Sequence, residues 1–250
     1  MPYASISTQF PGGVTNAAPH QTMSEAGTPD PSWSQLYHNE FNTFAASDFT
    51  LSGAGTQQAY LLTNSGIGGV LGLVSGPNNN DNAHLFQPVG SFQLTPNKHF
   101  FFKARVAVQF NAQQPTVYVG MALNAASVPA STDGLYFFKA ANSSQWVLRS
   151  IIGNVTTDTP LPAACTQSAD NVFIELGFHV DPQGNVEAFF NPTTGNNQSN
   201  AVQGTYRGRV ASAVGLSLTQ QLVAVCAGIQ NNTAANRILA IDYLTASAER

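Results

Sequence analysis

The sequence predicts an all-β protein in which two antiparallel sheets pack against each other, and two observations carry this prediction. Along residues 100–110, the even-numbered positions are Phe, Phe, Ala, Val, Val and Phe, and most of the odd-numbered ones are polar or small. Alternation with period two is typical of a strand with one buried and one largely solvated face. In addition, about twelve short apolar runs follow one another along the chain, separated by turn residues and without a helix of usable length.

The run at residues 100–110 is followed by a polar connection that ends at Pro115 and then by a second alternating run, residues 117–123. We expect these two runs to pair as antiparallel neighbours near the middle of a large sheet. A third run, residues 172–180, alternates in the same way, and residues 181–185 form a hairpin turn after it. In the first and third runs the even-numbered residues should face the core, because a shift by one residue would expose every apolar side chain.

The other elements follow from the same signals. A first strand region begins at Trp33, and residues 153–170 are expected to form a long loop. The last two strands should be joined by a hinge at Asn231-Asn232, since asparagine is a common turn residue. The further strands are expected at residues 59–62, 70–74, 135–138, 146–151, 186–190, 221–230 and 237–246.

Residues 1–31 differ in composition from the rest, because they are rich in proline and glycine and lack sustained periodicity. Such a segment cannot bury enough apolar surface to fold by itself. Two interpretations remain open: a disordered tail, or an extended arm that becomes ordered on a neighbouring subunit. An arm would use isolated apolar residues as anchors, here Tyr3, Ile6, Phe10 and Val14. We therefore divide the chain into an N-terminal arm, residues 1–31, and a β-sandwich domain, residues 32–250.

The composition argues against several classes of partner. Only 9% of the 250 residues are charged, against about 25% in ordinary domains. The net charge is −4, with nine Lys and Arg residues. Nucleic acid and anionic membranes are therefore unexpected partners. The first residues do not resemble a secretory signal, and no apolar run approaches the ~20 residues of a membrane-spanning helix.

The sequence offers few groups for catalysis or metal binding. Glu175, His179 and Asp181 share one face if residues 171–181 form a strand, but two carboxylates six residues apart lie about 20 Å from each other. This separation is too large for the acid and base of a glycosidase, so we expect an exposed polar strand face that does no chemistry. Residues 78–82 carry one carboxylate among four asparagines, which is too little charge for tight calcium binding. We expect neither a metal nor another cofactor.

The two cysteines, Cys165 and Cys226, fit no metal-binding spacing. Cys226 lies in an apolar run and is expected to be a small buried hydrophobic residue. Whether the two pair as a disulfide is left open by the sequence, although two thiols in a large core favour a reducing compartment.

Several longer phrases resemble a known group of proteins, the concanavalin A-like (laminin G-like) jelly-roll sandwiches that decorate the heads of tailed bacteriophages. The resemblance covers roughly residues 33–250 and consists of structural phrases without an active-site motif. These phrases are SWSQLYHNEFNTFAASDFTLSGAGTQQAYLLTNSG, FFFKARVAV, DGLYFFKA, NVFIELGFHVDPQGNVEAFF and RILAIDYLTASAER.

The resemblance implies a non-enzymatic virion protein, also called a cement protein, made in the host cytoplasm and attached to the outer surface of the capsid. Its partners would be the major capsid protein and further copies of itself, as a homo-trimer. The alternative is a carbohydrate-binding module of a phage head or tail fibre, which would bind surface glycans. A polysaccharide hydrolase is a third hypothesis, disfavoured by the spacing of Glu175 and Asp181.

Overall fold

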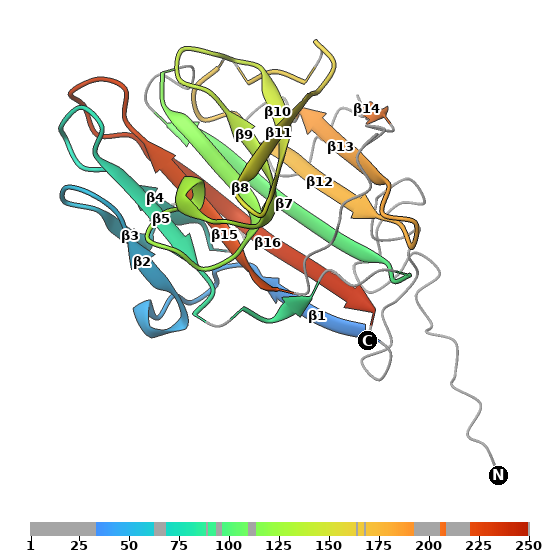
Figure 1. The fold of residues 1–250 in the computed structure, drawn as a ribbon. Coiled ribbons are helices and arrows are strands. Elements are labelled where there is room, and N and C mark those ends of the chain that lie inside the picture. The colour runs from blue at the N-terminus through green and yellow to red at the C-terminus, as the bar shows by residue number, and fades with distance from the viewer. Residues whose placement is uncertain are drawn as a thin grey trace.

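The protein is an all-β jelly-roll sandwich of the concanavalin A-like type, as the sequence predicts (Figure 1). A computed structural model describes residues 34–62, 69–88, 90–93, 97–109, 114–163, 165–167, 169–192, 206–208 and 221–249. Within these ranges there are two sheets of eight strands each, and every strand pairing is antiparallel. Two short 3-10 helices, η1 (Ala46–Asp48) and η2 (Val128–Ala130), interrupt the strands.

We call the first sheet A. Its long central strands are β7 (Phe100–Gln109) and β16 (Ile238–Glu249), which lie side by side (Figure 1). In spatial order, sheet A contains β14 (Tyr206–Gly208), β13 (Val186–Pro192), β12 (Ile174–Val180), β7, β16, β4 (Leu71–Val74) and β3 (Gln58–Leu61), and β1 (Ser34–Asn39) also pairs with β16.

The second sheet, sheet B, is centred on β8 (Thr116–Ala122) and β15 (Leu222–Gln230). In spatial order it contains β11 (Val155–Pro160), β10 (Trp146–Ile152), β9 (Gly134–Lys139), β8, β15, β5 (Asn82–Phe86) and β2 (Thr50–Ser52), and β6 (Phe92–Gln93) pairs with β15.

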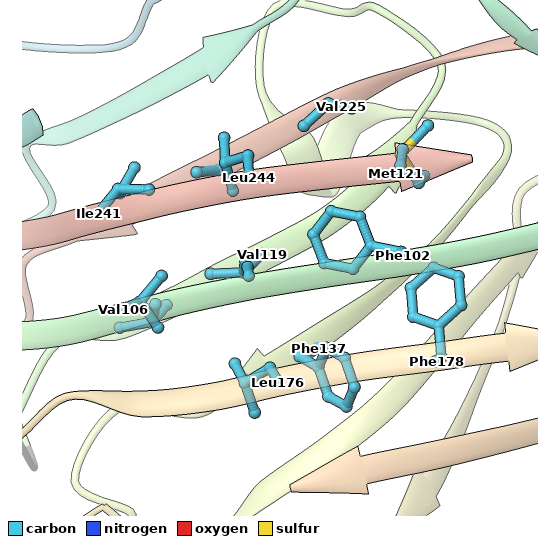
Figure 2. Close-up of a cluster of buried hydrophobic side chains, with 14 of the residues drawn as sticks. Phe102, Val106, Val119, Met121, Phe137, Leu176, Phe178, Val225, Ile241 and Leu244 are labelled. Carbon is cyan, nitrogen blue, oxygen red and sulfur yellow. The ribbon is translucent and has the colours of Figure 1, made fainter. Parts of the chain in front are cut away.

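The main core lies between the two sheets (Figure 2). Phe102 from β7 and Phe178 from β12 stack with ring centroids 5.2 Å apart. The ring of Phe137, from sheet B, has its centroid 6.0 Å from that of Phe178. Each of these rings is fully buried, and burial of a large apolar side chain stabilises the fold by about 1.5–3 kcal/mol.

The predicted alternation is confirmed. On β7 and β12 the even-numbered residues are buried from Phe100 to Val108 and from Ile174 to Val180. Phe110 falls outside the described residues, and Val172 precedes β12 instead of belonging to it. The turn after β12 is also confirmed, because the Asp181 N–H donates to the Asn185 carbonyl over 2.9 Å.

One strand pairing inferred from the sequence is wrong. Strands β7 and β8 do not pair: β7 lies between β12 and β16 in sheet A, whereas β8 lies between β9 and β15 in sheet B. The last two strands, β15 and β16, belong to different sheets, and Asn231-Asn232 begins the connection between them. Period-two alternation shows that a strand has a buried face, but it does not show which sheet the strand joins.

A second correction concerns the expected loop at residues 153–170. Its first part forms β11 (Val155–Pro160), which makes a hairpin with β10. The sequence signal was missed because the strand carries threonine and aspartate instead of alternating apolar residues, and nearly all of its side chains are exposed. In the described part of the chain no helix is long and apolar enough to cross a membrane.

The N-terminal arm inferred from the sequence, residues 1–31, lies outside the described residues, as do its anchors Tyr3, Ile6, Phe10 and Val14. The first described strand, β1, begins at Ser34. The division of the chain at residue 31 therefore stays a prediction.

Candidate functional site

Ionisable side chains gather on the outer face of sheet A, the face turned away from the core. They come from neighbouring strands because the odd-numbered positions of β7 and β12 point outward together. We call this surface the polar face; it comprises His38, His99, Phe101, Lys103, Arg105, Glu175, His179, Glu187, Asp242, Tyr243 and Thr245.

A β-bulge in β16 shapes one end of the polar face. The register with β7 shifts between Ile241 and Tyr243, which leaves Asp242 as an extra residue. The carboxylate of Asp242 accepts a hydrogen bond from the Arg105 guanidinium, and this guanidinium lies 4.4 Å from the centroid of the Phe173 ring. Both charged side chains are largely buried, so the positive charge is compensated where water has little access.

Next to this pair, Glu175 receives two partners. The Tyr243 hydroxyl donates to Glu175 Oε1 over 2.9 Å, and Lys103 Nζ lies 3.4 Å from the same oxygen. Burial, together with the Glu175 carboxylate, raises the pKa of Tyr243 well above its usual value. Glu175 is therefore held as an acceptor between two donors and is not placed as a general acid or base.

A stack of aromatic rings forms the other end of the polar face. The rings of Phe101 and His179 are nearly parallel, with centroids 4.2 Å apart. His179 Nε2 and His99 Nδ1 are 2.8 Å apart and share a hydrogen bond, while His179 Nδ1 lies 3.8 Å from Glu187 Oε2. Partial burial, and then the neighbouring His99, lower the pKa of His179.

The structure brings together one triad-like group that the sequence did not reveal. Nδ1 of His38 is 2.7 Å from the Thr245 hydroxyl, and Nε2 is 3.1 Å from Glu40 Oε1. These residues meet because β1 pairs with the end of β16, so that His38 lies opposite Thr245. Thr245 is buried in the middle of a strand pair. Its backbone N–H is therefore committed to the sheet, where it cannot contribute to an oxyanion hole of the kind that nucleophilic catalysis uses.

The set Glu175, His179 and Asp181 does not converge. Glu175 and His179 lie four residues apart on β12, which is about 13 Å along a strand. Asp181 Oδ1 accepts hydrogen bonds from the N–H groups of Gln183 and Asn185, over 2.9 and 2.8 Å. Asp181 is thus a turn-forming residue.

The outer face of sheet B is very different, because it is apolar and covered. Residues 123–133, which contain η2, fold over it and bury Val128 against a second hydrophobic cluster. Backbone and side-chain hydrogen bonds close this segment: the Leu123 N–H donates to Asp133 O over 2.8 Å, and Ser131 Oγ to Leu123 O over 2.7 Å. We call this surface the covered face; its cluster contains Phe86, Tyr118, Ala122, Val128, Tyr136, Ile151 and Cys226.

Two ionisable side chains of sheet B, His84 and Lys139, are deeply buried. His84 packs beside Tyr118 on the covered face, and burial lowers the pKa of His84 to about 4. Lys139 faces the interior; its ammonium donates to Pro115 O over 2.7 Å and to Ser143 O over 3.2 Å, and burial lowers the pKa of Lys139 to about 7. Lys139 has no exposed surface, so no substrate could reach it.

The remaining candidates have structural roles. Cys165 and Cys226 are both free and buried, and burial raises the pKa of Cys165 to about 11, so neither is a reactive thiolate. Asp81 Oδ2 accepts hydrogen bonds from the N–H and the side-chain amide of Asn78, which makes residues 78–82 a closed turn. Among the described residues, no group of three His, Cys, Asp or Glu side chains is arranged to hold a metal ion.

Comparison with known proteins supports the fold. The structure resembles a protein of unknown function from Shewanella oneidensis MR-1, with 12% identity, 87% of each chain covered and a TM-score of 0.58. It also resembles the lectin-like defence protein arcelin-5 from Phaseolus vulgaris (10% identity, 87% and 99% covered, TM-score 0.54) and an endo-1,3-beta-glucanase from Streptomyces sioyaensis (12%, 88% and 98%, TM-score 0.52). No known sequence family and no curated protein sequence matches the chain. At these identities the likeness extends to the fold and not to activity.

Proposed function

We propose that this protein is a non-enzymatic structural component of a tailed-phage virion that decorates and stabilises the outer surface of the capsid. The observation that carries the proposal is the polar face, on which the ionisable side chains are paired with one another. Glu175 is held by Tyr243 and Lys103, and Arg105 by Asp242. Such a surface supports attachment better than catalysis, because catalytic acids and bases must exchange protons with a substrate.

The chemistry of the polar face also suits a large wet interface. Because its charges are already compensated, covering it with a partner would not leave an unpaired charge buried, which is the costly case. A sparsely charged chain, with 9% charged residues, gains little from electrostatic steering. Such a chain suits a partner that presents many copies of one binding surface close together, as a capsid built from the major capsid protein does.

Electron microscopy of virions tests this function directly. Gold-labelled antibodies against the purified protein should mark the heads of intact particles at regular positions, and particles that lack the protein should lose their DNA at lower temperature or pressure. Label confined to the tail, or absent from the particle, would contradict the proposal.

The predicted arm provides a second test. Deleting residues 1–31 should leave the thermal unfolding temperature of the sandwich almost unchanged, since this segment has too little regular apolar content to join the core. Binding to undecorated capsids should weaken by orders of magnitude. A milder variant with alanine at Tyr3, Ile6, Phe10 and Val14 should act in the same direction. If the truncated chain decorates capsids as well as the full chain does, attachment lies on the sandwich.

Carbohydrate binding is the second candidate function, and the ring stack of Phe101 and His179 favours it. Half-buried aromatic rings on the outside of a sheet can offer their faces to the apolar side of a sugar. Binding of the purified chain to a glycan array should be lost in Phe101→Ala and retained in Phe44→Ala, whose ring is partly buried against the main core. That result would support this function. Tight glycan binding together with failure to bind capsids would replace the decoration proposal.

A further inference from the structure

Strand β11 (Val155–Pro160) lies at the edge of sheet B, and nearly all of its side chains are exposed. Among the described residues it pairs only with β10. Val155, near the hairpin tip, is 68% exposed, more than any other large hydrophobic side chain in the described part of the chain. An edge strand presents unpaired N–H and C=O groups and is a template for another strand.

The alternation of hydrogen-bonded and non-hydrogen-bonded pairs between β10 and β11 shows which backbone groups of β11 face outward. Gly153 and Asn154 both have positive φ, of 55° and 69°, as in a two-residue turn flanked by a hydrogen-bonded pair. At the other end of the hairpin, the Leu161 N–H donates to Trp146 O over 3.3 Å, which agrees with this alternation of bonded and non-bonded pairs. Since bonded and non-bonded pairs alternate, Thr156 and Asp158 direct their N–H and C=O groups away from β10.

The charge that would normally protect such an edge is compensated. Asp158 accepts two hydrogen bonds from the Arg149 guanidinium, over 2.6 and 2.7 Å. The Arg149 guanidinium carbon Cζ lies over the Phe138 ring, 3.7 Å from the ring centroid. A neighbouring strand would therefore meet a nearly neutral edge made of Thr156, Thr157 and the paired Asp158.

From this geometry we propose that β11 is an interface between two copies of the chain, which pair antiparallel about a two-fold axis at Thr157. In this register Thr156 lies opposite Asp158 of the second copy, and the symmetric pair repeats the contact. Each pair exchanges two N–H···O=C bonds. The two sheets B then become one continuous sheet.

Other symmetric registers are less favourable. Centring on Asp158 would place the two carboxylates opposite each other, and like charges in that position are destabilising. It would also place Thr156 opposite Pro160, which has no N–H to donate. Centring on Thr156 moves Asp158 opposite Asn154, which belongs to the turn. The edge is therefore self-complementary in the Thr157 register, and this favours a second copy over an unrelated strand.

The symmetry has a consequence for assembly. A two-fold contact pairs the same patch on both subunits and cannot close a ring of three. If the chain forms trimers by other contacts, β11 would join copies from neighbouring trimers. The contact involves few hydrogen bonds, so we expect it to matter where copies are concentrated.

Cysteine cross-linking tests the register. The Cα atoms of a non-hydrogen-bonded antiparallel pair are about 4.5 Å apart, within the range that a disulfide spans. Thr157→Cys should therefore form a linked dimer under mild oxidation. Val155→Cys, at a position that is also exposed, should not, because its two copies would lie about 13 Å apart. Cys165 and Cys226 are buried and give little background. Equal cross-linking of both variants, or of neither, overturns the proposal.

Sedimentation at increasing protein concentration tests the hydrogen bonds. Thr156→Pro removes an outward N–H without removing a hydrogen bond to β10, and its matched control Thr156→Ala keeps that N–H. The proline variant should weaken dimerisation at least tenfold, because two hydrogen bonds are lost across the dyad, whereas the alanine variant should dimerise like the natural chain. Unfolding midpoints check that both variants fold. A monomeric natural chain at millimolar concentration, or undiminished dimerisation of Thr156→Pro, overturns the proposal.

Discussion

The outer faces of the two sheets differ in chemistry and in how they are shielded from solvent. Both sheets have one face in the common core, and the other face must be compatible with its surroundings. On sheet A this second face carries ionisable groups that pair with one another, such as Arg105 with Asp242. On sheet B it is apolar, and residues 123–133 cover it, with Val128 packed on Tyr136. The comparison shows that sheet A places paired ionisable groups on its outer face, whereas the covered face of sheet B acts as a second core.

The largest expected effect tests whether the covered face is a true core. Tyr136→Ala should cost about 2–5 kcal/mol in the free energy of unfolding, as much as Phe102→Ala in the main core, because both rings are fully buried and leave a cavity. Urea denaturation of both variants measures the costs. A near-neutral Tyr136→Ala would mean that residues 123–133 close over the gap and that the covered face is loosely packed.

The second prediction concerns pH. His84 has a folded-state pKa of about 4, below its ordinary value of 6.5, because burial disfavours the charged ring. The unfolded chain therefore binds a proton first as the pH falls, and stability should decrease between about pH 6.5 and pH 4. A shift of this size corresponds to a loss on the order of 3 kcal/mol when complete.

The variant His84→Gln isolates this effect, since glutamine does not titrate. Its stability at pH 7 serves as the reference, and its further loss at pH 4.5 should be smaller than that of the natural chain. Equal losses in both would show that His84 is not buried as a neutral ring.

A third prediction uses the other ionisable group of sheet B. Lys139 has a pKa of about 7 in the folded chain against 10.5 ordinarily, so the unfolded chain binds more protons between these values. Stability should rise as the pH increases from about 7 to 10. Lys139→Met should remove much of this rise, which chemical denaturation at pH 7 and pH 9.5 would measure. A rise of equal size in the variant would contradict the assignment.

The fourth prediction moves to the polar face, where effects should be smaller. Arg105→Ala should cost about 2 kcal/mol, because it leaves Asp242 partly buried without its partner. Removing both charges with Arg105→Met and Asp242→Leu should recover most of the loss. A double variant as unstable as the sum of the singles would show that the two residues act independently.

The smallest effect is expected for the set Glu175, His179 and Asp181. Alanine at all three should leave particle assembly and infection unchanged, with a modest loss of stability that comes mainly from the turn at Asp181. The matched check is Asp181→Asn, which keeps an acceptor in the turn and should recover stability. Loss of a glycan-cleaving activity in the folded triple variant would contradict a non-enzymatic role.

The sequence by itself determined the fold class, which face of the long strands is buried, and the turn at Asp181. These features depend on contacts between residues close in the chain, and alternation shows directly which side of a strand is buried. The same reasoning identified Glu175 and His179 as outward-facing residues of one strand.

The tertiary structure alone decided which strands pair and which side chains meet. Strands β7 and β8 are consecutive and alternate in the same way, yet they lie in different sheets. Alternation shows which face of a strand is buried and not which sheet the strand joins. The hydrogen bonds of Glu175 with Tyr243 and of His38 with Thr245 join residues about 70 and about 200 positions apart in the chain. The cluster around Tyr136 likewise includes Val128, which comes from the loop at residues 123–133. Such contacts depend on sheet order and on the bulge at Asp242, and both are set by packing of the whole chain.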